Sequence, residues 1–395
     1  MSFAKKSVRD ADVAGKRALV RVDFNVPLSD GGVADDTRIR AALPTIELLR
    51  ERGAALVLAS HLGRPKGKHD PRLSLRPVGE RLAELLGADV VQAPAVVGDE
   101  VEAMASKLSG GEAMLLENLR FEPGETENDA ALAERLAALG DLYVNDAFGA
   151  AHRAHASTEG VAHRLPGYAG LLLEREVTEL TRVVESPARP LVVVLGGAKV
   201  SDKVGVIDRF LEVADRILIG GAMCFSFFRA RGIATGDSLV EEEGVELAEE
   251  ALRRAESSDC ELMLPVDLVL GRSFDAGTER RDSDGVEVPD GWMGLDVGPR
   301  TAAAYAEAIG AAGTALWNGP MGAFELEPFA AGTRTVAEAV AATRGTTVVG
   351  GGDSVAALHQ FGLADEVDWV STGGGASLEL LEGKKLPGVE ALQDA

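Results

Sequence analysis

The second half of the chain contains the stretch that decides the fold, LVVVLGGAK at residues 191–199. Five consecutive apolar residues are typical of a buried parallel strand, and the two glycines after them are typical of a turn. A similar stretch, ILIGGAM, follows at residues 217–223. This repeated order of strand, glycine turn and helix predicts a parallel sheet whose ligand-binding loops gather at its carboxyl edge.

Two more glycine clusters lie near the end of the chain, GGGDS at residues 350–354 and STGGGAS at residues 371–377. Glycine reaches positive φ and lets backbone N–H groups approach a ligand closely, so glycine clusters that open helices suit phosphate oxygens. Any single cluster could instead be a plain turn at a strand end. The repetition favours phosphate binding, and Asp353 in the first cluster suggests a magnesium-bound nucleotide.

Length and composition bound the class of protein. A chain of 395 residues exceeds what one hydrophobic core usually supports, so we expect two domains. No apolar run approaches the roughly eighteen residues that cross a bilayer, and no apolar segment follows Lys5 and Lys6. We therefore expect no membrane span and no secretory signal. Cys224 and Cys260 have no metal or redox spacing, which fits a reducing cytoplasm.

The net charge of −23 is unusual for a protein that binds phosphates, because a negative field slows the approach of anions. Local cationic side chains must therefore oppose the global charge. The surplus carboxylates, as in residues 241–243 and 246–250, resemble the solvated surfaces of proteins from high-salt cytoplasms, where salt screens self-repulsion. We expect a halophile-like protein with no nucleic-acid and no membrane partner.

The first half of the chain also alternates strands and helices. We expect strands at residues 17–22, 54–59, 89–92, 113–116 and 142–145, and helices at residues 40–52, 77–86, 100–108 and 129–139. A long helix at residues 170–186, ended by two prolines, connects the halves. The expected fold class is α/β, with two similar-sized Rossmann-like domains, each a parallel sheet with helices on both faces, joined by this helix and a hinge. The expected boundaries are 1–169, 170–186, 187–375 and a tail at 376–395.

Arginines near strand ends are the main chemical feature of the first half. They lie at or after the carboxyl ends of expected strands, where loops converge, and they are Arg21, Arg38, Arg64, Arg120 and Arg153. Guanidinium groups fork onto phosphate and carboxylate oxygens, so a cluster of them forms a small-anion pocket. Taken singly, each arginine could instead be a surface residue paired with a carboxylate.

Some aromatic residues have alternative interpretations. His61, His152 and His155 could be metal ligands, but no cysteine or carboxylate spacing completes such a site. Hydrogen bonding to phosphate is the better interpretation. Trp317 could stack on a nucleotide base, although a core or loop-packing role is at least as good an explanation.

Taken together, these motifs resemble the phosphoglycerate kinase family. The matching segments, in chain order, are RVDFNVP (21–27), SHLGRP (60–65), LENLRF (116–121), NDAFG (145–149), AHAS (154–157), GGAKVSDK (196–203), WNGPMG (317–322), FE (324–325), GGDS (351–354) and STGGG (371–375). They cover nearly the whole chain. The resemblance implies reversible phosphoryl transfer between 1,3-bisphosphoglycerate and MgADP, which gives 3-phosphoglycerate and MgATP.

The resemblance also implies the site residues. The phosphoglycerate-binding residues of the first domain would be Arg21, Asp23, Phe24, Asn25, Arg38, His61, Leu62, Gly63, Arg64, Arg120 and Arg153. The nucleotide-binding residues of the second domain would be Gly196, Gly197, Lys203, Gly221, Asn318, Pro320, Glu325, Gly351, Gly352, Asp353 and Ser354. Glu325 would hold the ribose hydroxyls, and Asp353 would ligate Mg²⁺. The catalytic groups would be Arg38, Lys199 and the N–H groups around Gly373 and Gly374.

The implied chemistry needs no catalytic base, because a carboxylate nucleophile is already ionised at neutral pH. It needs in-line alignment and compensation of the charge on a loose transition state. The resemblance further implies that the tail returns to the first domain. If the two ligands bind to different domains, transfer requires closure, with hinges expected near residues 170–186 and after Ser371.

Two rival functions are disfavoured by the same sequence. A P-loop or dinucleotide-binding enzyme would carry G-x-x-x-x-G-K-[ST], or G-x-G-x-x-G after its first strand, and neither motif is present. A catalytically silent nucleotide-binding protein would be expected to lack a transferring cation, whereas both Arg38 and Lys199 are present.

Overall fold

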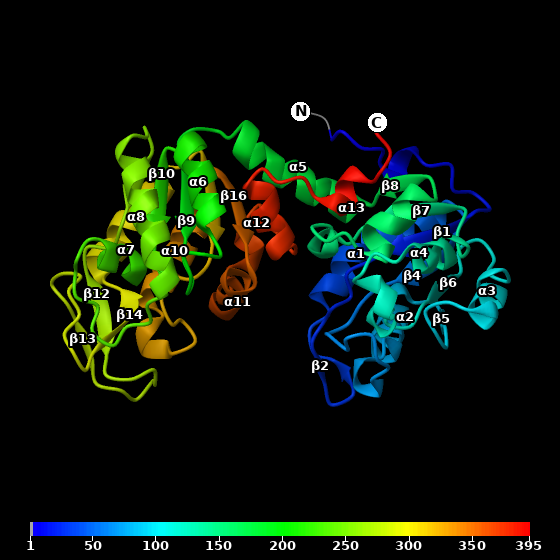
Figure 1. The fold of residues 1–395 in the computed structure, drawn as a ribbon, viewed down its shortest axis with the longest axis horizontal. Helices are drawn as coiled ribbons and strands as arrows, with labels where there is room; N and C mark the ends of the chain where they lie inside the picture. Colours follow the sequence, from blue (N-terminus) through cyan, green and yellow to red (C-terminus); the bar gives the residue numbers. More distant parts are fainter. Residues whose placement is uncertain (1–2) are drawn as a thin grey trace. The chain divides into compact units, whose positions relative to one another are not determined.

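The computed structural model describes residues 3–395 and shows an α/β chain of two compact units, which are described separately. The first unit contains the residues up to Thr178 together with Lys385–Ala395, and the second unit contains Glu179–Lys384. Each has its own six-stranded parallel sheet, which confirms the expected fold class (Figure 1). The second boundary lies later than the expected 376, because helix α12 (Gly375–Leu381) packs against α6 (Val204–Val213) in the second unit.

The first unit has the sheet order β5-β6-β4-β1-β7-β8. Its strands are β1 (Arg17–Arg21), β4 (Ala55–Ala59), β5 (Val90–Gln92), β6 (Ala113–Leu115), β7 (Leu142–Asn145) and β8 (Gly167–Ala169), with a separate hairpin of β2 (Leu28–Ser29) and β3 (Gly32–Val33). Its helices are α1 (Thr37–Glu51), α2 (Arg76–Leu86), α3 (Asp99–Ala105), α4 (Ala130–Ala137) and α13 (Pro387–Glu390). Helix α5 (Leu171–Glu185) crosses the boundary between the units.

Helix α1 shows how the first core forms. Its apolar residues Ile39, Ala42, Ile46 and Leu49 recur at helical spacing and are all buried in the same core cluster as β1 and β4. The helix begins at Thr37, earlier than the expected residue 40. Arg38 therefore lies in the first turn of a helix and not in the loop before it.

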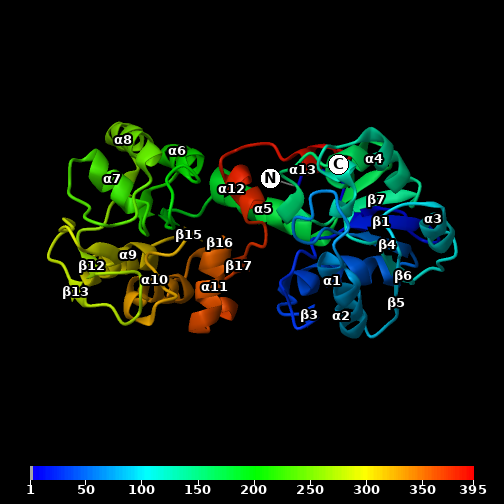
Figure 2. The same ribbon diagram turned by 60° about the horizontal axis from the view of Figure 1, so that its bottom comes forward.

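The second unit has the sheet order β11-β10-β9-β15-β16-β17. Its parallel strands are β9 (Leu191–Leu195), β10 (Arg216–Ile219), β11 (Glu261–Met263), β15 (Thr314–Asn318), β16 (Thr346–Gly350) and β17 (Trp369–Val370). Its helices, besides α6 and α12, are α7 (Cys224–Ala230), α8 (Glu242–Glu256), α9 (Pro299–Gly310), α10 (Ala331–Ala342) and α11 (Gly352–Phe361). Helices α6, α7 and α8 cover one face of the sheet, and α9, α10 and α11 cover the other (Figure 2).

A small antiparallel sheet in the second unit was not foreseen from the sequence. It consists of β12 (Leu268–Gly271), β13 (Arg280–Asp282) and β14 (Met293–Val297), in the order β13-β12-β14. Its strands are short, and the segment between β11 and β14 lacks the strand-turn-helix rhythm of the rest of the unit. The sheet matters because β12 and β14 form one wall of a pocket described below.

The order of the strands indicates where ligands bind. In the second unit the chain runs from β9 outward to β10 and β11, and then returns to β15 on the other side of β9. The loops that follow β9 and β15 therefore lead away in opposite directions, which opens a crevice at the carboxyl edge of the sheet. Strands β4 and β7 flank β1 in the first unit in a similar way. Among residues 3–395, none of the helices is both long enough and apolar enough for a membrane span.

Candidate active site

The first unit has a cationic pocket of about 520 Å³ at the carboxyl edge of its sheet. Arg64 comes from the loop after β4, Arg120 from the loop after β6, and Arg153 from the loop after β7, and all three line this pocket. Burial lowers the pKa of Arg120 to about 10, and the neighbouring charges of Arg153 and Arg21 act in the same direction. Cations held this close to one another favour a bound anion.

Hydrogen bonds hold the loop after β4 from several sides. The Oδ1 atom of Asn25 accepts from the N–H of Gly63 at 2.9 Å, and Oδ1 of Asn118 accepts from the N–H of Leu62 at 3.1 Å. Nη1 of Arg120 donates to the carbonyl of Gly63 at 2.7 Å. The loop that carries His61 is therefore tied to the ends of its neighbouring strands.

Arg38 is restrained but accessible. Its Nη1 atom donates to Oδ2 of Asp23 at 3.1 Å, and Oδ1 of Asp23 accepts from the N–H of Asn25 at 3.2 Å. The side chain of Arg38 remains 37% exposed while that of Asp23 is 10% exposed. Asp23 thus orients a guanidinium group that can still reach a ligand.

Five residues that were expected to bind substrate are buried, namely Arg21, Asp23, Phe24, His61 and Leu62. Phe24 and Leu62 belong to the apolar core, and the N–H of Phe24 donates to Oγ of Ser60. Arg21 is 1% exposed and donates to His61 from beneath. In this structure Arg21, Phe24 and Leu62 support the loops around the pocket. Their expected part in binding substrate stays a prediction. A sequence motif cannot distinguish a ligand-binding side chain from the residue behind it.

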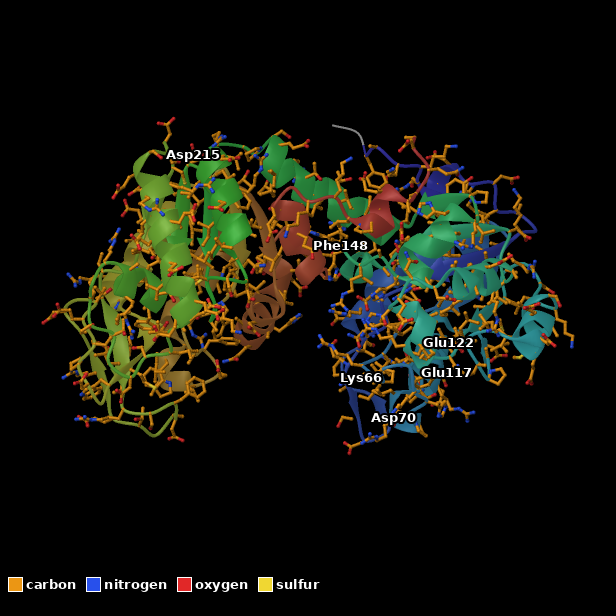
Figure 3. The ribbon with its side chains drawn as sticks, in the orientation of Figure 1. Lys66, Asp70, Glu117, Glu122, Phe148 and Asp215 are labelled. Atoms are coloured by element: carbon orange, nitrogen blue, oxygen red, sulfur yellow. The ribbon has the colours of Figure 1, made fainter. Side chains whose placement is uncertain are left out.

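Glu117, labelled in Figure 3, was quoted within a motif but given no role from the sequence. It follows β6, and its carboxylate accepts from the N–H of Leu75 at 2.9 Å and from Oγ of Ser74 at 2.7 Å. It also accepts from the N–H of Asn118 at 2.7 Å. Since Leu75 is the N-cap of α2, Glu117 fastens that helix to the edge of the site. The signal that the sequence offered was an acidic residue directly after an expected strand.

The second unit has a polar cavity of about 570 Å³ lined by the glycine loops. It brings together Gly197, Lys199, Lys203, Asn318, Gly351, Gly352, Asp353 and Ser354 with Gly375. These residues come from the loops after β9, β15 and β16 and from the start of α12. The loops converge as the strand-turn-helix rhythm predicts.

The two lysines of the loop after β9 differ in environment. Lys203 is 8% exposed, and its Nζ atom donates to the carbonyls of Gly196 and Asn318. Burial lowers its pKa to about 8, although Asp353 and Asp202 oppose that shift. Lys199 is exposed. Both residues precede α6, which begins at Val204.

Close approach of the loops explains two of the glycines. A Cβ on Gly196 would lie 2.0 Å from the carbonyl oxygen of Pro320. Gly221 has φ +67°, and a Cβ there would lie 2.4 Å from the nitrogen of Gly197. The absence of side chains therefore allows loop to pack on loop, in addition to any contact with phosphate.

Two further groups differ in what they offer a ligand. Ser354 is fully buried, and its hydroxyl accepts from the N–H of Gly319, so it supports the loop. Its expected contact with nucleotide stays a prediction. The buried Nδ2 of Asn318 has no hydrogen-bond partner within residues 3–395. An unpaired buried donor beside the glycine loops is available to a ligand oxygen.

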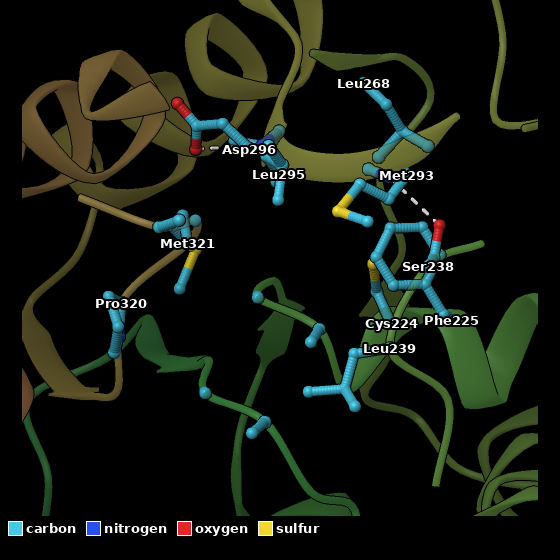
Figure 4. Close-up of a pocket in the computed structure, with 18 of the residues that line it drawn as sticks. Cys224, Phe225, Ser238, Leu239, Leu268, Met293, Leu295, Asp296, Pro320 and Met321 are labelled. Atoms are coloured by element: carbon cyan, nitrogen blue, oxygen red, sulfur yellow. Dashed lines mark hydrogen bonds between the residues drawn. The ribbon is translucent and has the colours of Figure 1, made fainter. Parts of the chain in front are cut away.

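An apolar cavity of about 950 Å³ shares the lining residues Gly197 and Asp353 with the polar one. Figure 4 shows the side chains around this apolar cavity. Its wall is largely apolar and includes Cys224, Phe225, Leu239, Leu268, Phe274, Met293, Leu295 and Met321, with Pro320, Gly221 and Glu325 also lining it. A pocket with one apolar and one polar compartment suits a nucleotide, whose base is flat and whose phosphates are charged.

The apolar wall was largely missed from the sequence. Cys224 and Phe225 lie on α7 and are buried, and Leu268 and Met293 lie on β12 and β14 of the unforeseen antiparallel sheet. Trp317 does not take part, because it is fully buried and its Nε1 donates to the carbonyl of Gly319.

Comparison with known proteins identifies the family. The family profile named phosphoglycerate kinase matches residues 8–384. The chain belongs to the phosphoglycerate kinase family. It is 57% identical to phosphoglycerate kinase from Chloroflexus aurantiacus over 397 residues, which covers 99% of each chain, and 56% identical to that from Roseiflexus sp. over 395 residues, which covers 100% of each. A solved structure of phosphoglycerate kinase from Coxiella burnetii superposes with a TM-score of 0.88 at 40% identity, covering 98% of both chains.

Membership of the phosphoglycerate kinase family makes the chain a phosphotransferase of the bacterial type, with the activity of an ATP:3-phosphoglycerate 1-phosphotransferase. The family implies magnesium with the nucleotide, and the residues present fit it. Asp353 is exposed in the first turn of α11 and lines both the apolar and the polar cavity of the second unit. A magnesium ion that travels with a nucleotide commonly uses one or two protein carboxylates, phosphate oxygens and water. Within residues 3–395 no three His, Cys, Asp or Glu side chains gather in a way that would hold a metal without such a ligand.

Proposed function

We propose that the cationic pocket of the first unit binds 3-phosphoglycerate and 1,3-bisphosphoglycerate, and that the two adjoining cavities of the second unit bind ADP and ATP. The observation that supports this proposal is that the pockets of the two units are lined by different kinds of groups. One unit presents guanidinium groups around a small polar pocket, and the other presents glycine loops beside an apolar cavity. A triose phosphate needs the first arrangement, and a nucleotide needs the second.

In the first unit we assign the substrate phosphate to Arg64, Arg120 and Arg153. These three line one pocket, and planar guanidinium groups match the geometry of phosphate oxygens. Asp23, Asn25 and His61 lie on the neighbouring loops and suit the hydroxyl and carboxyl groups of the substrate. We assign Gly63 to the site through its backbone. Its φ of +60° lets the loop after β4 turn tightly.

In the second unit we assign the base to the apolar cavity and the phosphates to the glycine loops. Glu325 is exposed on the rim of the apolar cavity, which suits a hydrogen bond to ribose hydroxyls. Asn318 offers its unpaired Nδ2 to phosphate. Asp353 would hold magnesium, which supplies charge neutralisation at the phosphates when bound.

For the chemical step we assign Arg38 and Lys199 to the transferring phosphoryl group. The attacking carboxylate of 3-phosphoglycerate is ionised at neutral pH, so no general base is needed. The transition state spreads negative charge over three equatorial oxygens, and the two cations, aided by the N–H groups around Gly373 and Gly374, would offset that charge. Since the two substrates are assigned to different units, the reaction requires the units to bring them together and exclude water.

We further propose a cytoplasmic monomer whose acidic surface is adapted to salt. The supporting facts are the net charge of −23 and the two cysteines, which are unpaired and buried. High salt screens repulsion between surface carboxylates, so stability should rise between low salt and about 1 M. Full activity and full helicity at low ionic strength would contradict the adaptation to salt.

Two binding measurements test the assignment of ligands to units. Arg153→Ala should weaken 3-phosphoglycerate binding in calorimetry and leave ADP binding unchanged, because the lost contacts are all in the first pocket. Phe274→Ser should do the reverse, because it removes an apolar side chain from the rim of the second. If either variant altered mainly the other ligand, the assignment of ligands to units would be wrong.

A further inference from the structure

A buried acid lies beneath the cationic pocket of the first unit. Glu125 ends the short 3₁₀ helix η4 (Pro123–Glu125) and is fully buried. Its carboxylate accepts from the hydroxyl of Ser157 at 2.6 Å and from the N–H of the same residue at 3.1 Å. Burial raises the pKa of Glu125, while the charge of Arg21 and the bonds from Ser157 oppose that shift. Burial of a carboxylate destabilises the fold unless the carboxylate is paired and hydrogen-bonded, so the partners of Glu125 must offset that cost.

Arg21 connects Ser157 to His61. Its Nε donates to Oγ of Ser157 at 2.9 Å, and its Nη2 lies 3.1 Å from Nδ1 of His61. Its Nη1 donates to the carbonyl of Val22. All three nitrogens of the guanidinium group are therefore engaged within the protein, and the group has one orientation. Ser157 donates its single hydroxyl proton to Glu125 and accepts a hydrogen bond from Arg21. Each hydrogen bond from Arg21 through Ser157 to Glu125 therefore has one donor and one acceptor.

This chain of bonds decides which ring nitrogen of His61 carries a proton. A guanidinium group can only donate, so Nδ1 of His61 must accept. Burial and the charges of Arg21, Arg120 and Arg38 hold the pKa of His61 well below its usual value, so the ring is neutral. A neutral imidazole that accepts at Nδ1 carries its proton on Nε2. His61 then offers a donor to an anionic ligand and no second acceptor.

We propose that Glu125, Ser157 and Arg21 form a relay that positions His61 as an Nε2–H donor to phosphoglycerate. Glu125 and Ser157 are positioning residues, since they act through Arg21. The relay also explains why the charge of Arg21 lies beneath a pocket that already contains three exposed or half-buried arginines. The inference rests on the proposed binding of phosphoglycerate by the first unit.

The first test is the tautomer itself. Nitrogen-15 NMR of the ligand-free, full-length protein labelled in its histidine rings should show His61 with a protonated Nε2 and an unprotonated, hydrogen-bonded Nδ1 near pH 7. A signal from protonated Nδ1, or from a ring protonated on both nitrogens, would overturn the proposal. The assignment of the signal comes from the spectrum of His61→Gln.

The second test breaks the relay at two points. Ser157→Ala removes the hydroxyl that joins Glu125 to Arg21, and Glu125→Gln removes the charge with little change in volume. Either variant should convert the His61 signal to a mixture of tautomers and raise KM for 3-phosphoglycerate about tenfold, as expected for one weakened hydrogen bond, with a smaller change in kcat. A purely structural role would lower the melting temperature and leave the tautomer unchanged, and that outcome would also overturn the proposal.

Matched controls separate the relay from general effects of substitution. Glu134→Gln on the exposed face of α4 and Ser106→Ala at the C-terminal end of α3 should leave the His61 spectrum and KM unchanged. If Glu125→Gln does not fold, Ser157→Ala, which keeps the charged groups of both Glu125 and Arg21 in place, decides alone. Failure of the proposed function would appear differently: 3-phosphoglycerate would leave the His61 signals unmoved, although the tautomer in the free protein could still be as stated.

Discussion

Under the proposed function both units bind a phosphate in an acidic protein, but they offer it different chemical groups. The first unit uses side chains. Arg64, Arg120 and Arg153 converge from three loops, and Arg21 and Glu125 lie buried beneath them. The second unit uses backbone, because glycine loops pack against each other there and leave N–H groups near the cavity.

The two regions also differ in how they stabilise buried charged groups. In the first unit the buried charges form a connected network, since Arg21 reaches Glu125 through Ser157. In the second unit Lys203 is buried, and the carbonyl groups of Gly196 and Asn318 accept hydrogen bonds from its ammonium group and stabilise its charge. The first region should therefore be sensitive to loss of a partner, and the second to anything that disturbs the backbone.

The largest expected effect should be the same in both regions. Arg38→Ala and Lys199→Ala each remove one cation from the transferring phosphoryl group, so each should lower kcat by about 10² or more. The measurement is a coupled assay of 3-phosphoglycerate-dependent ATP consumption at saturating substrates. A change confined to KM would remove that residue from the catalytic step.

The buried lysine of the second unit, Lys203, should make the free energy of unfolding depend on pH, whereas a surface lysine of the first unit should not. The pKa of Lys203 in the folded protein is about 8, below the ordinary value of 10.5, so the folded state binds fewer protons than the unfolded state between these pH values. The free energy of unfolding should therefore rise with pH over that range, by up to roughly 3 kcal/mol at about 1.4 kcal/mol per unit. Lys203→Met should flatten this rise in urea unfolding curves recorded from pH 7.5 to 10.5. Lys107→Met, on the surface of the first unit, should leave the slope as it is.

Adding a single methyl group should disturb the packing of the glycine loops in the second unit. Gly196→Ala places a Cβ against the carbonyl of Pro320 and should destabilise the protein by about 1–3 kcal/mol, with weaker ADP binding. Gly310→Ala at the end of α9 meets nothing within 4 Å and should be neutral or slightly stabilising. Thermal unfolding and calorimetry measure both effects. Equal stability and equal ADP affinity of the two variants would show that the loops can move to accommodate a side chain at residue 196.

The smallest effect is expected at the rim of the nucleotide pocket. Glu325→Ala removes one exposed acceptor for ribose and should weaken ADP binding by about 1 kcal/mol, while KM for 3-phosphoglycerate stays the same. The nearby Glu327→Ala serves as the control, since that residue does not line the pocket. Unchanged nucleotide affinity in Glu325→Ala would contradict the ribose assignment.

Local patterns carried much of the fold and part of the site. The strands at 142–145 and 191–195 were predicted to the residue, because uninterrupted apolar runs identify buried parallel strands. Convergence of Arg64, Arg120 and Arg153 followed from their positions after parallel strands. The start of α1 was missed, since Thr37 and Arg38 carry no apolar periodicity.

What the sequence determined by itself is what depends on neighbours along the chain: apolar runs, glycine turns, the family motifs and the identity of the charged residues. The tertiary structure alone decided which of those residues face a ligand. Arg21 and Arg64 look alike in the sequence, yet Arg21 is buried with every nitrogen engaged while Arg64 is exposed in the pocket. The physical reason is that burial and hydrogen-bond partners arise from contacts across more than a hundred positions, as between Arg21 and Ser157, and no local pattern records such contacts.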